Sequence, residues 1–360
     1  MKYKVDKNTN KSAYLQIYEQ LREDVVDGIY PYGARLPSKR MIADEAEVSV
    51  ITVEHAYGLL CDEGYAESRE RSGYYVIYRQ SDFFAVDYES DRKKPIKEIR
   101  AAEKNDFPFS VMAKAMRKVL NDYGESILSK TTNTGTAELR TALAKYLIRS
   151  RRIYATPGQI VVGSGAEYLY GLIVTMLGRD RVYGIEKPCY RKIEQIYEAS
   201  GVRVDMLPLG NDGIESRALA LTAASVLHIT PYRSFPSGVT ATATKRKEYL
   251  YWASMGDRYI VEDDFESEFT LASKPEETVY SLADGSNVIY MNTFSKTVSS
   301  ALRVGYMVLP KDAVELFDDR VGFYTCPVSA FEQLVLAELI NNGDFERHIN
   351  RVRRRKRKGI

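Results

Sequence analysis

Between residues 135 and 305 short apolar runs alternate with stretches of helical character, and this alternation limits the fold more than any other feature. The runs are rich in Val, Ile and Tyr, as expected of strands that are buried on both faces. They occupy residues 159–162, 181–185, 225–229, 258–261 and 288–291. Strands separated by helices predict an α/β fold with a mostly parallel sheet and helices on both of its faces. Ligands of such folds bind beyond the carboxyl ends of the strands, where the polar motifs of this chain fall.

Residues 292–305 place one lysine, Lys296, among small hydroxyl side chains, and Arg303 follows seven positions later. The apolar run at 258–261 leads into an acidic pair, Asp263 and Asp264. Pyridoxal phosphate requires an amine for a Schiff base, an anion for its pyridinium nitrogen, and hydroxyls with a guanidinium for its phosphate. The two motifs together therefore predict a site for this cofactor.

Each motif of this site also has a simpler interpretation. The turn formed by Ser164, Gly165 and Ala166 could hold a phosphate at the start of a helix, or it could only connect a strand to that helix. Tyr190 could stack on the cofactor ring or belong to the core. The acidic pair could be a solvated loop, and Arg303 a surface arginine rather than a phosphate fork.

Length and composition exclude several classes of protein. A chain of 360 residues suffices for two domains. It has no apolar run long enough to span a membrane and no secretion signal after its first residues. Three widely spaced cysteines provide no disulfide framework, which favours the cytoplasm, and three scattered histidines give no support to a metal site.

The first eighty residues predict a winged helix-turn-helix. Residues 12–28 place apolar side chains on one helical face, and Ser38 and Ser49 can each cap a further short helix. Residues 69–76 have the pattern of a strand-turn-strand wing. Such a unit places a recognition helix in the major groove of DNA and a wing on its backbone.

This segment closely resembles the DNA-binding domain of the GntR family, through residues 33–40, Ser49, 52–53, 63–65 and 72–73. The resemblance implies a double-stranded DNA operator as the partner. The residues that would face it are Arg35, Ser38, Arg40, Ser49, Thr52, Arg71, Ser72 and Gly73. Most members carry arginine just after the capping serine, where this chain has Val50 and Ile51, so we expect a different operator preference. The alternative is a winged helix that contacts only proteins.

The chain as a whole resembles fold-type I aminotransferases, and specifically the MocR-like subfamily, in which a GntR winged helix is fused to such a domain. The resemblance implies that Lys296 forms a Schiff base with pyridoxal phosphate and that Asp263 pairs with the pyridinium nitrogen. It implies that the phosphate is held by Ser164, Gly165, Ala166, Thr293, Ser295 and Arg303. Residues 231–238 match the family's turn beneath the ring.

The chain departs from the family pattern at several positions. Phe265 stands where the family has a tyrosine that bonds the ring oxygen, which should raise the pKa of the imine and hinder turnover. Residues 232–234 replace Ser-His-Gln, and Glu167 with Tyr168 replaces paired glutamines. Residues 344–358 resemble the helix that leads into a small C-terminal subdomain, which we expect to be missing together with its substrate-binding arginine.

The expected domains are a winged helix over residues 1–78, a charged linker over 79–104, an aminotransferase-like domain over 105–345, and a basic helix remnant over 346–360. The linker could instead be an irregular arm on the second domain, and the basic segment could be a nucleic-acid tail. The resemblance implies a cytoplasmic, homodimeric transcription regulator that senses an amino compound or the cofactor. Two alternatives remain, a working aminotransferase with a DNA-binding module and a truncated, inactive product.

Overall fold

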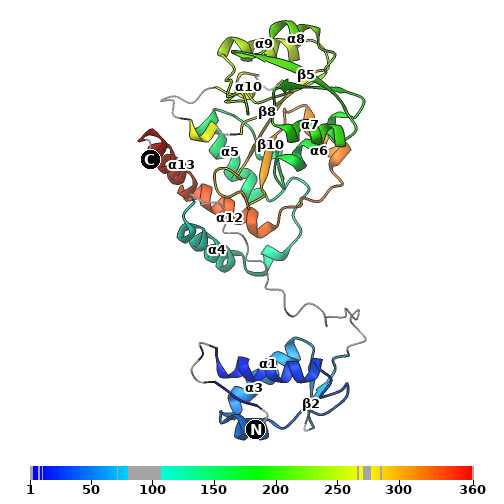
Figure 1. Cartoon of the computed structure of the whole chain (residues 1–360), viewed down its shortest axis with the longest axis vertical. Coiled ribbons are helices and arrows are strands. Elements are labelled where there is room, and N and C mark those ends of the chain that lie inside the picture. Colours follow the sequence, from blue (N-terminus) through cyan, green and yellow to red (C-terminus); the bar gives the residue numbers. More distant parts are fainter. Residues whose placement is uncertain are drawn as a thin grey trace. The chain divides into compact units, whose positions relative to one another are not determined.

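The computed structural model describes residues 3–6, 9, 11–70, 72–79, 107–265, 267–270, 277–283 and 286–358. The chain divides into two compact units, Met1–Arg100 and Ala101–Ile360 (Figure 1). Except for Arg79, the predicted linker over residues 79–104 lies outside the described residues. No helix in the described ranges is long and apolar enough to cross a membrane.

The smaller unit is a winged helix. Its elements are α1 (Ala13–Val26), α2 (Lys39–Ala46), α3 (Val50–Asp62), β1 (Ala66–Arg69) and β2 (Gly73–Val76). The predicted caps are confirmed, because Ser38 Oγ accepts a hydrogen bond from the amide of Met41 and Ser49 Oγ from that of Thr52. The helices enclose a small core that includes Ile17, Ile42 and Val53, and β1 pairs with β2 in antiparallel register to form the wing.

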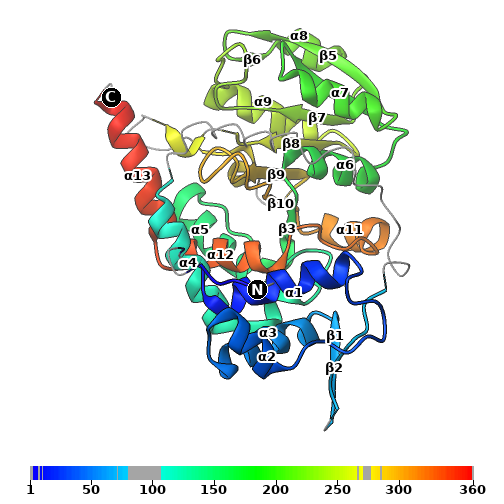
Figure 2. The same cartoon turned by 60° about the horizontal axis from the view of Figure 1, so that its bottom comes forward.

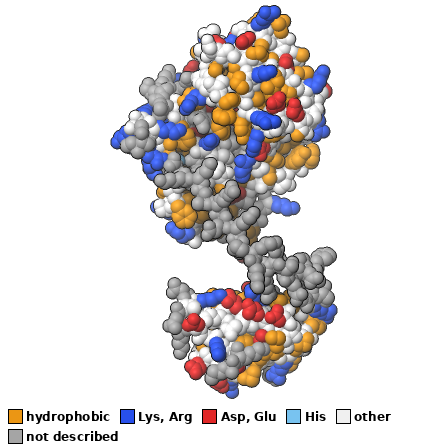
Figure 3. Space-filling view, viewed as in Figure 1, with side chains coloured by type: hydrophobic (Ala, Val, Ile, Leu, Met, Phe, Trp, Pro, Cys, Tyr) orange, Lys and Arg blue, Asp and Glu red, His pale blue; other side chains and the backbone are white. Residues whose placement is uncertain are grey.

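Charge on both units is locally mixed. In the view of Figure 3, acidic side chains of the smaller unit gather on one part of its surface, and cationic and hydrophobic side chains are interspersed on the larger unit. The whole chain carries a formal net charge of only +2. Attraction to DNA must therefore come from the local placement of a few cations rather than from a large positive field.

The larger unit is built on a sheet of eight strands, in the order β3-β10-β9-β8-β7-β4-β5-β6. Their bounds are β3 (Ile160–Gly163), β4 (Val182–Lys187), β5 (Arg203–Gly210), β6 (Gly213–Ile214), β7 (Val226–Ile229), β8 (Tyr259–Asp263), β9 (Val288–Thr293) and β10 (Gly305–Val308). The five strands from β9 to β5 run parallel, whereas β10 is antiparallel to both of its neighbours and β6 to β5. The predicted mostly parallel sheet is confirmed.

Successive residues of each central strand face opposite sides of the sheet and enter two separate cores. Val288 and Tyr290 of β9 pack in one core, Ile289 and Met291 in the other. The first core is covered by α5 (Ala137–Arg151), α9 (Ala243–Ala253), α10 (Val279–Leu282) and α12 (Ala330–Asn341). The second is covered by α6 (Ala166–Leu177), α7 (Arg191–Ala199) and α11 (Ala313–Val321). Figure 2 shows α5 and α12 on one side of the central strands and α6 and α11 on the other.

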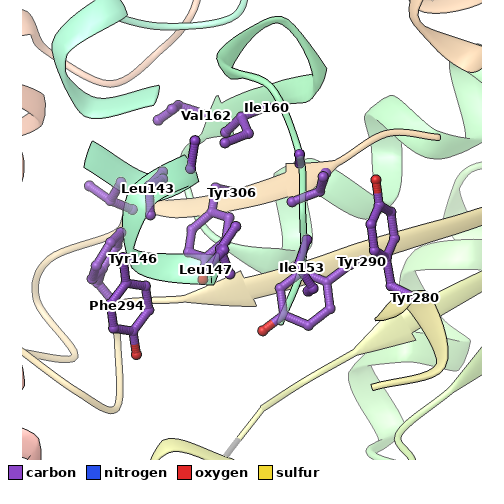
Figure 4. Packing of buried hydrophobic residues seen from close by; sticks show 14 of the residues in the cluster. Leu143, Tyr146, Leu147, Ile153, Ile160, Val162, Tyr280, Tyr290, Phe294 and Tyr306 are labelled. Carbon is purple, nitrogen blue, oxygen red and sulfur yellow. The ribbon is translucent and has the colours of Figure 1, made fainter. Parts of the chain in front are cut away.

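Aromatic side chains fill much of the first core. In Figure 4, Tyr146 and Leu147 of α5 lie beside Tyr306 of β10, and Tyr290 and Tyr280 continue the same layer. The remaining elements are α4 (Phe109–Tyr123), η3 (Gly124–Leu128), η4 (Pro157–Gln159), α8 (Ser216–Leu221), η5 (Ser267–Phe269) and α13 (Asp344–Arg357). The packing of the first core fixes the ends of β8 and β9, from which the candidate site is built.

Candidate functional site

A cavity of about 380 Å³ lies at the carboxyl ends of the parallel strands, within the usual range of small-molecule sites. Most of the residues that the sequence predicts to hold the cofactor line it. These are Ala166, Tyr190, Asp263, Thr293, Ser295, Lys296 and Arg303. Ser164 and Gly165 precede them at the start of α6 and are not among the lining residues. Tyr170, Lys192, Ile193 and Thr230 also line the cavity and belong to no motif recognised in the sequence, whereas Phe235, a further lining residue, comes from the turn over residues 231–238.

Asp263, the last residue of β8, is buried and held in one orientation by its neighbours. The hydroxyl of Tyr170 donates a hydrogen bond of 2.5 Å to its Oδ2, and His228 Nε2 lies 3.7 Å from the same oxygen. His228 in turn is bonded through Nδ1 to Tyr197 at 2.7 Å. Within the described part of the chain Oδ1 accepts no hydrogen bond. The carboxylate is thus fixed through one oxygen, and the other can accept a bond from a protonated ring nitrogen.

Asp264 belongs to a different environment. Its Oδ2 lies 2.9 Å from Nε of Arg151 and accepts a hydrogen bond from Tyr290 at 2.7 Å, in a buried cluster that also contains Glu268. Burial raises the pKa of Glu268 to about 7. Because Asp264 is committed to this cluster and does not line the cavity, only Asp263 of the acidic pair can serve a ligand there.

Lys296 follows β9, the strand beside β8. Its Nζ lies 5.2 Å from the centroid of the Phe265 ring, within the range of a cation–π contact. The register of the two parallel strands pairs Asp263 with Met291. The amine and the carboxylate therefore reach one cavity because their strands are neighbours and end at the same edge of the sheet.

The start of α6 fits an anion such as a phosphate group. Gly165 has a φ of 86°, which favours glycine, and α6 begins at the next residue. A Cβ at Gly165 would lie 3.4 Å from Nη2 of Arg303, so the guanidinium is in van der Waals range of this turn. The first amides of a helix carry positive partial charge, and a neighbouring guanidinium adds to it. Together with Asp263 and Lys296, these groups fit pyridoxal phosphate.

Two aromatic side chains at the cavity, Tyr190 and Phe235, are exposed, whereas Tyr170 is buried in the second core. Tyr190 is 43% exposed and Phe235 59%, and their rings meet edge to face at 6.2 Å. The interpretation of Tyr190 as a core aromatic is therefore wrong. Phe235 comes from the turn over residues 231–238, which is tied down by the buried Ser234 hydroxyl bonded to Glu186. Glu186 also accepts the amide of Thr230 at 3.1 Å, and burial raises its pKa to about 7.

On the winged helix, the predicted DNA-facing side chains come from the loop before α2, from the start of α2, from the start of α3 and from the wing. Arg35 and Arg40 are exposed, and a Cβ at Gly73 would lie 3.2 Å from Nε of Arg35, so this arginine lies against the wing. Ser49 and Thr52 are bonded to each other at 2.8 Å. Ser38 caps α2. Arg71 lies outside the described residues.

The positions just inside α3 are apolar and open to solvent. Val50 is 40% exposed and Ile51 65%. Ser72, at the wing, bonds its hydroxyl to that of Tyr75 at 2.7 Å, and Arg69 lies 4.3 Å from the centroid of the Tyr75 ring. The guanidinium of Arg69 is a further cation on the wing, beside the predicted DNA-facing residues.

Two family models match the chain. Residues 13–76 match the bacterial regulatory proteins of the gntR family, and residues 87–358 match aminotransferase class I and II. The HTH-type transcriptional regulator YdeL of Bacillus subtilis is 32% identical over 96% of this chain and 77% of its own length. The probable rhizopine catabolism regulatory protein MocR of Rhizobium meliloti is 28% identical over 97% of this chain and 76% of its own. The pyridoxine biosynthesis regulator PdxR of Corynebacterium glutamicum is 26% identical over 94% of this chain and 75% of its own.

Solved aminotransferases share the fold of the larger unit. The kynurenine aminotransferase of Pyrococcus horikoshii, in complex with PMP, superposes with a TM-score of 0.63 at 25% identity and covers 70% of this chain. LysN, the α-aminoadipate aminotransferase of Thermus thermophilus, complexed with N-(5'-phosphopyridoxyl)-L-leucine, has a TM-score of 0.61 at 25% identity and covers 69%. The matches cover 66% and 64% of those two enzymes.

Proposed function

The chain belongs to the gntR family of bacterial regulatory proteins, in the MocR-like group that carries an aminotransferase class I and II domain, and from this premise we propose that ligand binding in the cavity controls its binding to DNA. It is a DNA-binding transcriptional regulator whose aminotransferase-like domain binds pyridoxal phosphate.

One observation supports the assignment of the cofactor residues above all. Asp263 and Lys296, at the ends of neighbouring parallel strands, line one cavity together with Arg303 from the next segment. When bound, pyridoxal phosphate supplies an aldehyde that takes up an amine and a ring that withdraws electrons. Lys296 would provide the amine, and Asp263 would accept the ring nitrogen's proton in a hydrogen bond. Arg303, Thr293, Ser295 and the turn of Ser164, Gly165 and Ala166 would hold the phosphate, with Tyr190 beside the ring.

The sensed ligand is an amino compound or the cofactor itself. An incoming amine would compete with the amine of Lys296 for the same carbon, and the Lys296 side chain, once displaced, would leave its position over Phe265. A change of this kind at the cavity alters the affinity for DNA only if the DNA-bound and free arrangements of the protein bind the ligand differently. We expect that difference to be transmitted through a homodimer in the cytoplasm, which presents two winged helices to two half-sites.

The test is a DNA-binding titration in the presence and absence of the cofactor. Duplexes selected by the protein from a randomised pool would be labelled and titrated by fluorescence anisotropy, with wild type and Lys296→Ala. We expect pyridoxal phosphate to change the dissociation constant of the wild type for DNA and to leave that of Lys296→Ala unchanged. An equal response of both proteins would contradict the role of Lys296 in sensing.

A second candidate function is aminotransfer, because the cavity contains the lysine and carboxylate that this chemistry uses. Phe265 lines the cavity where the resembling enzymes have tyrosine, and it cannot donate a hydrogen bond to the cofactor ring. We therefore expect purified protein to show no turnover of an amino donor with a keto acid. Sustained product formation that is lost in Lys296→Ala would establish the enzyme instead.

A further inference from the structure

The carboxylate of Glu167 is ion-paired with the two cations that a phosphate group would need. It lies in the first turn of α6 and also lines the cavity. Its Oε1 lies 2.7 Å from Nζ of Lys192, and its Oε2 lies 3.2 Å from Nη2 of Arg303. Both cations line the same cavity. One carboxylate thus bridges an ammonium and a guanidinium beside the start of the helix.

The carboxylate is stabilised in its charged form. The hydrogen bond from Lys192 is the main cause that lowers the pKa of Glu167, and the charges of Lys192 and Arg303 act in the same direction. The free backbone N–H groups in the first turn of a helix also favour a negatively charged side chain there. These three attractions, from the helix start, an ammonium and a guanidinium, are the ones by which proteins bind phosphate.

We propose that Glu167 is an internal competitor of the phosphate group and sets a low affinity for pyridoxal phosphate. The phosphate can engage Arg303 and Lys192 fully only when the carboxylate releases them, and until it does so the two anions repel each other. Bound pyridoxal phosphate consequently exchanges with pyridoxal phosphate in solution. The fraction of protein that holds the cofactor therefore follows the concentration of free cofactor. This inference rests on the proposed function and names the sensed ligand as the phosphorylated cofactor itself.

The exposure of the cluster limits the size of the effect. The side chains of Glu167, Lys192 and Arg303 are 43%, 53% and 52% exposed, so water and salt screen their charges. Exposed ion pairs contribute little, and removing the competing charge should tighten binding by roughly two- to fivefold. The effect should shrink as the salt concentration rises.

Glu167→Gln is the most direct variant, because glutamine keeps the shape of the side chain and removes its charge. The control is Glu198→Gln, the same change at an exposed position of α7 that does not line the cavity. Dissociation constants for pyridoxal phosphate would be measured by absorbance titration at low and physiological salt. Pyridoxal, which lacks the phosphate, and inorganic phosphate as a competitor would be titrated alongside.

We expect Glu167→Gln to bind pyridoxal phosphate roughly two- to fivefold more tightly, and inorganic phosphate to compete better, while the affinity for pyridoxal stays unchanged. Glu167→Ala, which also removes the carboxylate, should tighten binding as well, and Glu198→Gln should not. Equal or weaker binding of pyridoxal phosphate by both Glu167 variants would overturn this inference and leave the proposed function standing. If neither wild type nor Glu167→Gln binds pyridoxal phosphate at all, the inference and the proposed function fail together.

Discussion

Tyr170 donates a hydrogen bond of 2.5 Å to Oδ2 of Asp263, and the two side chains come from segments 93 positions apart. Burial, followed by the charge of Asp263, raises the pKa of Tyr170 well above its ordinary value, so the phenol stays protonated and remains a donor. The bond connects the helix that begins at the proposed phosphate subsite to the strand that carries the cavity's carboxylate. It therefore couples the two ends of the candidate site.

Tyr170→Phe should lower the free energy of unfolding by about 1–3 kcal/mol, because a buried carboxylate loses its closest hydrogen-bond donor and water does not replace that hydrogen bond. Urea denaturation followed by circular dichroism measures the change. Tyr251→Phe, at an exposed position of α9, serves as the control and should have no effect. Equal stabilities for Tyr170→Phe and wild type would mean that the bond does not hold Asp263 in place.

Glu186 should make stability fall as the pH rises from about 4.5 to about 7. Burial raises its pKa to about 7, so between these values the folded protein holds a proton that the unfolded chain has lost. The slope of this contribution is at most about 1.4 kcal/mol per pH unit. The stability that Glu186 contributes is fully present below the pKa of its carboxyl in the unfolded chain. It is lost as the pH rises through the pKa of the carboxyl in the folded protein.

Glu186→Gln isolates this contribution. The amide oxygen can still accept the Thr230 amide, and the amide nitrogen can donate to Ser234, so both contacts survive without a titrating group. We expect the variant to show a shallower decline of stability across this window, measured by urea denaturation at several pH values. Glu198→Gln is the matched control, and an unchanged slope in Glu186→Gln would show that Glu186 is ionised throughout.

Local patterns in the sequence were sufficient to predict much of the fold. The caps at Ser38 and Ser49 depend only on a hydroxyl two or three residues from a free amide, and buried runs such as 258–261 are recognisable by composition. β5 and β10 were not predicted. β5 contains Arg203 and Pro208 and has few buried positions, and the short β10 directly follows the lysine motif. Neither has a periodicity that separates it from a loop.

The sequence predicted which chemical groups form the candidate site, but not the hydrogen bonds and ion pairs that join them. Asp263 and Asp264 are adjacent and chemically identical. Only the tertiary structure shows that Asp264 is ion-paired with Arg151. The network of Glu167 with Lys192 and Arg303 joins three segments and has no local signature. Tyr170 could have been found, because it lies one helical turn after Ala166 and must share its face of α6.

Arg40→Ala should weaken binding to a selected duplex and reduce its dependence on salt. Arg40 is exposed on α2, from where its guanidinium is proposed to contact the DNA backbone, and the loss of one phosphate contact lowers the slope of log affinity against log salt by roughly one. Anisotropy titrations at several salt concentrations measure both quantities. Arg203→Ala, on the larger unit, should change neither, and an Arg40→Ala protein with wild-type slope would exclude the docking model.

The exposed side chains of Val50 and Ile51 should favour thymine in the operator. They stand at the start of α3 with no polar group to pair with a base edge, and apolar side chains in the major groove contact the thymine methyl group. Replacing single thymines by deoxyuracil in a selected duplex removes only that methyl. We expect binding to weaken at one or two positions in wild type and to weaken less at one of these positions in Ile51→Ala, whereas a uniform response of both proteins would contradict this readout.

Pyridoxal phosphate should be held through the amine of Lys296. Protein mixed with the cofactor would be reduced with borohydride, digested, and searched by mass spectrometry for the modified lysine. Wild type and Lys192→Ala, which lacks the other lysine of the cavity, should both carry the adduct at Lys296, and Lys296→Ala should carry none. An adduct at a different lysine, or a chromophore that forms equally well in Lys296→Ala, would contradict the assignment of Lys296 as the lysine that binds the cofactor.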